Sequence, residues 1–255
     1  MTASAPLWID EADAVLFDLD GVVTDTAAVH QQAWRALFEP LLAERTPNRP
    51  YREDDYFRYI DGMPRFDGVR ALLASRDLRL PDGDPGDPPD ASTVCGLGNR
   101  KNAVFGDILR RDGVRVFAGT VRLLDHLAGI GIPVALVSSS RNAQPVLAAA
   151  GLTDRFPVVI DGEVAARDHL HGKPAPDMFR RAAADLGVAP ERSVVIEDAV
   201  SGVEAGHAGG FPVVGVDRGV GADTLLRAGA DRVVADPGDL LTPAEPAPIP
   251  SPDRP

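Results

Sequence analysis

The chain has 255 residues, of which 44% are hydrophobic, so it can form one large domain or two smaller ones with a sizeable core. Its formal net charge of −12 argues against a general nucleic-acid-binding or anionic-membrane surface, but it leaves room for a local basic phosphate pocket. The single cysteine, Cys95, excludes an internal disulfide framework and fits a reducing compartment.

The N-terminal segment, residues 1–10, has no basic region and no long apolar core, and no stretch of the chain approaches about 20 consecutive apolar residues. We therefore expect a cytoplasmic protein that does not bind membranes or nucleic acid.

The first expected element is a buried strand at residues 14–17, an apolar run bounded by charge. Two carboxylates, Asp18 and Asp20, follow at its C-terminal end, and Gly21 then turns the chain. Ligands of open α/β sheets bind at the carboxyl ends of strands, so this junction suggests a nucleophile, a proton carrier and a hard cation. The alternative interpretation is a polar strand end followed by an ordinary turn.

Helices dominate the next part of the chain. Residues 26–44 are expected to form a helix with Thr26 as its N-cap, and helical patterns recur at 66–75 and 99–111. The Pro, Gly and Asp run at 81–89 must be a loop. From Val114 onward helices and strands alternate: helices are expected at 119–128, 144–150, 175–186 and 203–208, and strands at 133–137, 158–160, 193–196, 212–216 and 232–235.

This alternation predicts an α/β fold with a Rossmann-like parallel sheet and right-handed crossovers. The first strand belongs with this sheet although about 85 mostly helical residues separate it from the next strand. We therefore expect a catalytic core formed by residues 11–28 and 114–241 and an inserted helical cap at 29–113. The proline-rich residues 242–255 are expected to be a disordered tail.

Three further segments end strands of the same expected sheet. Residues 138–142, Ser-Ser-Ser-Arg-Asn, could bind an anion at a helix N-terminus, although serine is also an ordinary N-cap. Lys173 precedes a helix, where its charge opposes the helix dipole. It is one of only two lysines, with Lys101, against 24 arginines, which suggests a position that needs a compact ammonium. Glu197 and Asp198 end another strand and could instead cap the next helix.

Four carboxyl groups would thus gather at one sheet edge: Asp18, Asp20, Glu197 and Asp198. Without a cation they would repel one another and raise one another's pKa. Mg²⁺ relieves this repulsion with oxygen ligands and commonly shares a phosphate. Ser138 and Lys173 would then balance the charge of that phosphate.

The four segments, in this order, resemble the four motifs of the haloacid dehalogenase superfamily of phosphotransferases, and they span Asp18 to Asp198. The resemblance extends to the helical insertion. Residues 18–30 with Trp34, residues 62–67 and residues 100–102 are similar to those of the β-phosphoglucomutase family.

The resemblance implies a role for each position. Asp18 would be the nucleophile that becomes phosphorylated, and Asp20 the general acid/base, whose main-chain carbonyl also binds Mg²⁺. Asp198 would bind Mg²⁺ with Glu197 beside it, and Ser138 and Lys173 would hold the transferring phosphoryl group. The distal phosphate would be held by Arg65, Ser140, Arg141 and Asn142. His30 and Lys101 would serve the hinge and the cap side of the sugar pocket. The remaining substrate-binding residues would be Trp34, Gly62 and Ser139.

The family resemblance implies an enzyme that interconverts β-glucose 1-phosphate and glucose 6-phosphate through β-glucose 1,6-bisphosphate, and we expect a monomer. A sugar-phosphate phosphatase with the same core is the alternative, and an inactive sugar-phosphate-binding protein is a third interpretation. The sequence departs from the family pattern in three places: Arg141 replaces a usual lysine, Gly172 replaces a usual serine, and the loop at 81–89 is longer than expected.

Overall fold

The structure is a computed structural model that describes residues 9–60 and 65–241. Contacts divide the chain into two compact units. Unit 1 comprises the chain up to Thr24, Val116–Ala143 and the chain from Thr153 onward, and unit 2 comprises Asp25–Arg115 and Gln144–Leu152. Helix α6 (Ala143–Ala149), which the sequence analysis placed in the core, thus falls almost entirely in unit 2. The assignment of the units as core and cap, with the boundaries expected above, stays a prediction.

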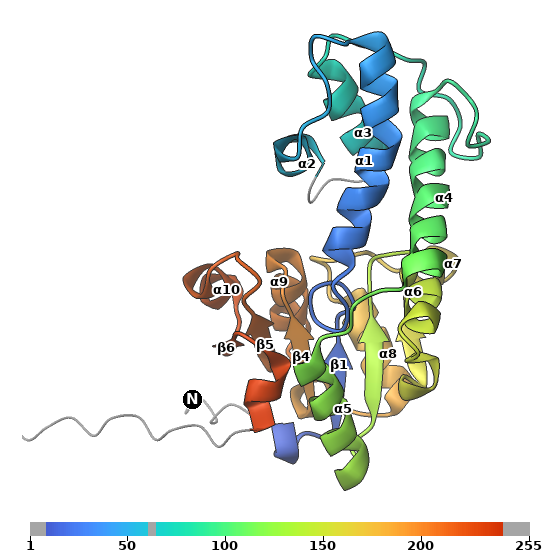
Figure 1. The fold of residues 1–255 in the computed structure, drawn as a ribbon. Helices are drawn as coiled ribbons and strands as arrows, with labels where there is room; N and C mark the ends of the chain where they lie inside the picture. Colours follow the sequence, from blue (N-terminus) through green and yellow to red (C-terminus); the bar gives the residue numbers. More distant parts are fainter. Residues whose placement is uncertain (1–8, 61–64, 242–255) are drawn as a thin grey trace, which may run out of the picture. The chain divides into compact units, whose positions relative to one another are not determined.

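Unit 1 is built on a six-stranded, fully parallel sheet in the order β3-β2-β1-β4-β5-β6 (Figure 1). The chain first moves outward from β1 to β2 and β3, then crosses back to the other side of β1 to form β4. This reversal makes the carboxyl ends of β1 and β4 a topological switch point, where open α/β sheets bind their ligands. The strands are β1 (Ala14–Phe17), β2 (Val134–Val137), β3 (Val158–Ile160), β4 (Ser193–Glu197), β5 (Val213–Val216) and β6 (Arg232–Val234).

The strands form because short runs of valine, isoleucine and other apolar residues are buried on both faces of a parallel sheet. Every residue of β1, β2, β4 and β5 is buried. One core cluster packs Leu16 of β1 and Val195 of β4 against Phe179 and Val203 of two covering helices. The helices and 3₁₀ helices of unit 1 are η1 (Ile9–Glu11), α5 (Ala118–Ile130), η2 (Thr153–Arg155), α7 (Gly162–Arg167), α8 (Asp177–Leu186), η3 (Pro190–Arg192), α9 (Val200–Gly209), α10 (Ala222–Ala228) and η4 (Pro237–Leu241).

Unit 2 is helical and has its own core. Trp34 and Phe38 stack in α1 with ring centroids 5.6 Å apart, and they pack with Leu72 of α3 and Leu97 of α4. Besides α6, its helices are α1 (Thr26–Arg45), α2 (Asp54–Tyr59), α3 (Arg65–Ala74) and α4 (Val94–Asp112).

The α/β fold with its parallel sheet is confirmed, and the helix ends correct several details. Asp25, not Thr26, holds the N-cap position of α1, and Thr26 is the first helical residue. Helix α4 begins five residues earlier than expected, because Thr93 caps it by accepting a hydrogen bond from the Gly96 amide at 2.9 Å. Helices α2, α7 and α10 are short and gave no clear sequence signal. Gly62 and the expected tail, 242–255, lie outside the described residues.

Candidate active site

Asp18 lies directly after β1, where parallel pairing fixes its backbone. Its amide donates to the carbonyl of Ile196 in β4 at 3.0 Å, and only 7% of the residue is exposed. The chain then turns at Gly21, which has φ +84°. A Cβ there would lie 1.9 Å from Oδ2 of Asp198, so only glycine allows both this turn and the close approach of that carboxylate. The turn therefore brings the ends of β1 and β4 together.

Lys173 joins the ends of three strands. Its Nζ donates to Oδ1 of Asp18 at 2.5 Å, to Oε1 of Glu197 at 2.6 Å and to the carbonyl of Val137 in β2 at 3.0 Å. All three donors of the ammonium are thereby used. The side chain is only 6% exposed, and burial by itself would lower the pKa of this lysine, but the two carboxylates reverse that effect and raise it. Lys173 therefore stays charged beside Asp18.

Glu197 is held so that it faces Lys173. Its second oxygen, Oε2, accepts the amide of Ala199 at 2.9 Å, and its side chain is 1% exposed. A Cβ on Gly202, in the first turn of α9, would lie 1.7 Å from Oε1 of Glu197. Gly202 thus leaves the space that the carboxylate occupies, and Glu197 in turn orients the ammonium of Lys173.

Three carboxylates meet in a group that could hold a metal ion. One oxygen each from Asp18, Glu197 and Asp198 lies within 4.8 Å of the others. Burial, followed by the charges of Glu197 and Asp20, raises the pKa of Asp198 to about 7. Burial is also the largest cause of the raised pKa of Asp18, which Lys173 only partly offsets. The single ammonium of Lys173 does not balance three carboxylates, and the donors of the group are all hard oxygens, so it fits Mg²⁺.

Asp20 is half-buried in the turn that follows Asp18. Its carboxylate is not one of the three gathered oxygens, and the Mg²⁺ contact expected of its main-chain carbonyl stays a prediction. The turn is closed by the Gly21 amide donating to the Thr24 carbonyl at 2.8 Å and the Thr24 amide donating to the Leu19 carbonyl at 2.9 Å. Asp20 is thus presented on a compact turn beside the buried nucleophile candidate.

The serine-rich segment after β2 forms a compact turn. The hydroxyl of Ser138 accepts the amide of Ser140, and the hydroxyl of Ser140 accepts the amide of Asn142, both at 3.1 Å. Ser138 is buried and Ser139 is exposed. These bonds are local turns that serine favours and not N-cap bonds to α6, which begins at Ala143, and each hydroxyl keeps its hydrogen for another acceptor. Arg141 is exposed, with its Nε 3.7 Å from Oε1 of Glu163.

In unit 2, Lys101 is buried and donates to Nδ1 of His30 at 2.6 Å. Its Nζ also lies 5.3 Å from the centre of the Trp34 ring and 4.8 Å from that of Phe105. Burial, followed by the charge of Lys101, lowers the pKa of His30 to about 3. His30 is therefore a neutral imidazole that accepts at Nδ1 and carries its hydrogen on Nε2.

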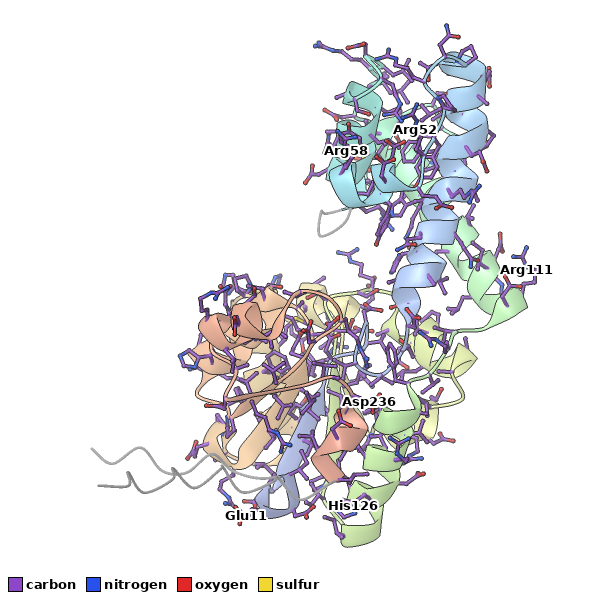
Figure 2. The ribbon with its side chains drawn as sticks, turned by 60° about the vertical axis from the view of Figure 1, so that its left-hand side comes forward. Glu11, Arg52, Arg58, Arg111, His126 and Asp236 are labelled. Atoms are coloured by element: carbon purple, nitrogen blue, oxygen red, sulfur yellow. The ribbon has the colours of Figure 1, made fainter. Side chains whose placement is uncertain are left out.

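Both lysines of the chain are thus buried among polar or aromatic partners, while the arginines labelled in Figure 2 lie on the outside of unit 2. Arg52, Arg58 and Arg111 are all exposed. Arg76 is also buried, so burial alone does not separate the lysines from the arginines, and the inference that lysine is kept where a compact ammonium is needed stays a prediction.

Arg65 begins α3. Its Nη2 donates to Oδ1 of Asn99 at 3.2 Å, and its guanidinium carbon lies 4.9 Å from the centre of the Phe66 ring. Arg65 belongs to unit 2 and Arg141 and Asn142 to unit 1, so their joint grip on a distal phosphate stays a prediction.

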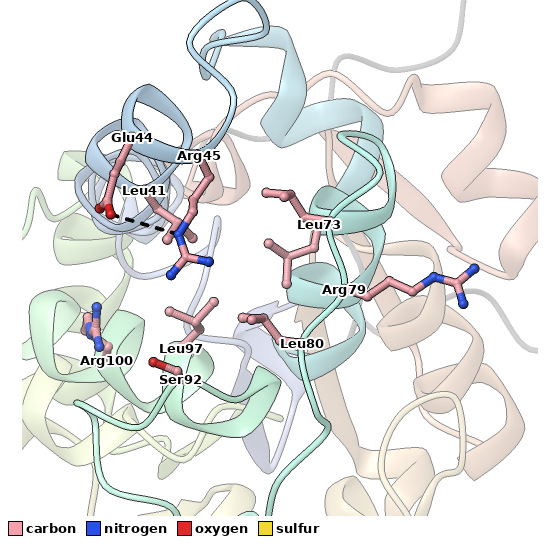
Figure 3. Close-up of a pocket in the computed structure, with 10 residues that line it drawn as sticks. Leu41, Glu44, Arg45, Leu73, Arg79, Leu80, Ser92, Leu97 and Arg100 are labelled. Carbon is pink, nitrogen blue, oxygen red and sulfur yellow. Dashed lines mark ion pairs between the residues drawn. The ribbon is translucent and has the colours of Figure 1, made fainter.

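A cavity of about 170 Å³ lies elsewhere in unit 2 (Figure 3). Leucines such as Leu41, Leu73 and Leu80 line it, together with Arg45 and Arg100. None of the expected site residues lines it, so the cavity is separate from the chemistry described above.

One residue near the carboxylates was missed by the sequence analysis. Nε of Arg218 donates to the Gly21 carbonyl at 2.7 Å, and the guanidinium lies 3.8 Å from the centre of the Phe117 ring. Arg218 thereby braces the turn that carries Asp20. Its position shortly after β5, at the same edge of the sheet as Asp18, was the available signal.

No helix among the described residues is long and apolar enough to cross a membrane.

Comparisons with known proteins agree with this geometry. Residues 12–210 match a family model described as haloacid dehalogenase-like hydrolase. A β-phosphoglucomutase from Mycobacterium bovis is 49% identical over 243 residues, which cover 91% of this chain and 92% of the relative. A phosphorylated carbohydrates phosphatase from Thermotoga maritima is 30% identical and covers 90% of this chain and 96% of the relative.

Among solved structures, a haloacid dehalogenase family hydrolase from Deinococcus radiodurans with bound phosphate and sodium has a TM-score of 0.68 and 34% sequence identity. The match covers 91% of this chain and 94% of that one. The motif order, the sheet, the carboxylate–lysine cluster and these matches lead to one conclusion: the chain belongs to the β-phosphoglucomutase family of the haloacid dehalogenase superfamily.

Proposed function

We propose that this chain is a β-phosphoglucomutase that interconverts β-D-glucose 1-phosphate and D-glucose 6-phosphate through β-glucose 1,6-bisphosphate. The observation that carries the proposal is the buried Lys173, which bridges Asp18 and Glu197 at distances of 2.5 and 2.6 Å. It holds a carboxylate nucleophile and a phosphate-binding cation side by side at the switch point of the sheet. The full-length similarity to a β-phosphoglucomutase supports the choice of substrate.

In the proposed reaction, the carboxylate of Asp18 is the phosphoryl carrier. A phosphorylated Asp18 passes its phosphoryl group to the 6-hydroxyl of β-glucose 1-phosphate, and the Asp20 carboxylate takes the proton from that hydroxyl. The bisphosphate then binds in the opposite orientation. Asp18 attacks the 1-phosphoryl group, the bond to the sugar oxygen breaks, and the protonated Asp20 returns the proton to that oxygen. Glucose 6-phosphate leaves, and Asp18 is phosphorylated again.

The other residues of the cluster serve charge and orientation. Lys173 neutralises charge on the transferring oxygens and partly offsets the rise that burial causes in the pKa of Asp18, and Glu197 holds the ammonium in place. Mg²⁺, held by Asp18, Asp198 and the main chain of Asp20, would supply further electrostatic stabilisation of the phosphoryl group. Positioning and electrostatics account for most of the catalysis in phosphoryl transfer.

A sugar-phosphate phosphatase is the second candidate, because a full-length relative at 30% identity carries that activity in its name. The two reactions share Asp18 and Asp20 and differ in the acceptor of the phosphoryl group, which is a sugar hydroxyl in the mutase and water in the phosphatase. The expectations of a monomer and of a cytoplasmic location stay predictions.

The test is to incubate the purified protein with Mg²⁺, β-glucose 1-phosphate and a trace of the bisphosphate. We expect glucose 6-phosphate without a matching amount of inorganic phosphate, and no turnover with Asp18→Asn. Stoichiometric release of inorganic phosphate would instead identify a phosphatase. Turnover by Asp18→Asn within tenfold of the wild type would remove Asp18 as the nucleophile.

A further inference from the structure

The amide side chain of Asn99 connects two parts of unit 2 that are far apart in sequence. Its Oδ1 accepts from Nη2 of Arg65 at 3.2 Å. Its Nδ2 donates to the carbonyls of Pro85 at 3.0 Å and Asp87 at 2.8 Å. These bonds use both donors of the amide and one of the two lone pairs of its oxygen.

The two carbonyls belong to the loop that joins α3 to α4, residues 75–93, within which lies the Pro, Gly and Asp run. Figure 1 shows this loop folded back beside the N-terminal half of α4. Its backbone is fastened to the first turn of that helix, because the amide of Val94 donates to the Pro81 carbonyl at 2.9 Å and that of Cys95 to the Asp82 carbonyl at 3.0 Å. The loop is therefore a built support for Asn99.

Arg65 is fixed on its other side by α4 itself. A Cβ on Gly98 would lie 2.6 Å from the Phe66 ring and 3.5 Å from Cγ of Arg65. Only glycine at this position lets the first turn of α3 approach α4 so closely. Gly98 thus sets the distance between the helices, and Asn99 sets the direction of the guanidinium.

We propose that Asn99 is a positioning residue that uses the α3–α4 loop to hold Arg65 in the orientation that grips the phosphate not being transferred. The inference rests on the proposed function of Arg65. A neutral amide orients a guanidinium without adding a carboxylate that would compete with the phosphate for it. The unusual length of the loop at 81–89 then has a purpose, which is to bring two carbonyls to the amide of Asn99.

The experiment compares two reactions in Asn99→Ala. Mutase turnover needs the second phosphate grip, whereas hydrolysis of acetyl phosphate uses only the residues around Asp18. Asn99→Ala removes a hydrogen bond to a charged group, which weakens the orientation of Arg65 toward the phosphate. We therefore expect mutase kcat/KM to fall about tenfold, mainly through a higher KM. The inhibition constant of glucose 6-phosphate against acetyl phosphate hydrolysis should rise by a similar factor, while the KM for acetyl phosphate stays within about twofold.

A double-mutant cycle shows whether Asn99 acts through Arg65. In an Arg65→Ala background, Asn99→Ala should change mutase kcat/KM by less than about twofold. Ser75→Ala is the control, because it also removes side-chain hydrogen bonds in the same unit, the bond that Ser75 donates to the Leu72 carbonyl at 2.6 Å and the bond that it accepts from Nη1 of Arg76 at 2.8 Å, and should leave both reactions unchanged. An undiminished effect of Asn99→Ala in the Arg65→Ala background would overturn the proposal, as would an equal loss of both reactions.

Asn99→Asp tests the contribution of the loop. The carboxylate keeps an acceptor for Arg65 but loses both donors, so it faces the carbonyls of Pro85 and Asp87 and competes with phosphate for the guanidinium. We expect an impairment at least as large as that of Asn99→Ala, and wild-type kinetics would contradict the role of the loop. A wild type that makes no glucose 6-phosphate would refute the mutase proposal, while the glucose 6-phosphate inhibition constants would still decide the role of Asn99.

Discussion

At the scale of single residues, the neutral state of His30 has a consequence for stability. Its pKa is about 3 in the folded protein, against an ordinary value of 6.5. Between these values the unfolded chain binds a proton that the folded protein excludes. The contribution of His30 to stability is therefore complete above pH 6.5 and is lost as the pH falls toward 3, by about 1.4 kcal/mol per pH unit inside that window.

Urea unfolding of the wild type and His30→Gln between pH 7 and pH 4.5 measures this effect. Glutamine cannot be protonated, so the variant should lose less stability than the wild type as the pH falls from 6 to 4.5. Parallel curves for the two proteins would contradict the lowered pKa of His30. An imidazole spectrum at pH 6 should also show the tautomer with its hydrogen on Nε2.

Gly202 gives a second prediction at this scale. Gly202→Ala places a Cβ in the space of the Glu197 carboxylate, so that Glu197 must move and Lys173 loses a partner. We expect a loss of about 1–3 kcal/mol in stability from overpacking and on the order of 10²-fold in kcat from the displaced ammonium.

Gly129→Ala is the matched control for Gly202→Ala. It is also a helical glycine of unit 1, but a Cβ there meets nothing within 4 Å. It should raise stability by about 0.5–1 kcal/mol and leave turnover unchanged. Full activity of Gly202→Ala would show that the position of Glu197 is unimportant.

At the scale of helices and loops, a buried ion pair holds unit 2 together. Arg76, which follows α3, donates to Oδ2 of Asp55 in α2 at 2.5 Å, and both side chains are less than 10% exposed. The same guanidinium donates to the carbonyls of Arg49 and Pro50 at 3.1 Å. The pair therefore ties the loop between α1 and α2 to the end of α3.

Arg76→Met should destabilise the protein by about 3–5 kcal/mol, because it leaves the Asp55 carboxylate buried without its cation. The double variant Arg76→Met/Asp55→Leu should recover part of that loss, since no charge is left buried. Chemical unfolding of the three proteins measures the difference. This interpretation would be contradicted if the double variant lost more unfolding free energy than the two single variants lose together.

At the scale of the whole molecule, the carboxylate cluster should couple metal binding to stability. Asp18 and Asp198, the two carboxylates proposed to hold Mg²⁺, come from two strand ends of one sheet, so a cation that binds them only in the folded state stabilises the fold. With free Mg²⁺ at about 100 times its Kd, we expect a gain of about 2.7 kcal/mol. Chelation with EDTA should reverse it.

Asp198→Asn removes one charge from the cluster and leaves the Lys173 contacts in place. Because burial and neighbouring carboxylates raise the pKa of Asp198, the variant should be at least as stable as the wild type without Mg²⁺ and should gain much less when Mg²⁺ is added. An equal Mg²⁺-dependent shift of the melting temperature in both proteins would place the metal elsewhere.

The sequence by itself determined the parallel α/β architecture and the order of the site motifs. Short runs of β-branched residues form strands locally, and the carboxyl ends of parallel strands share one edge. Asp18, Asp198 and Lys173 could therefore be assigned to one site before any contact was known. The start of α4 at Val94 was missed because its cap, Thr93, follows a proline-rich run that gives only loop signals.

Only the tertiary structure decided which atoms meet. The bond between Lys173 and Asp18 joins residues 155 positions apart, and it depends on the packing of three strand ends. The same holds for the clearance that Gly202 gives Glu197 and for the link from Arg65 through Asn99 to the α3–α4 loop. Local sequence sets propensities for helix, strand and turn, whereas distances of 2.5–3 Å between remote side chains follow from how the finished elements pack.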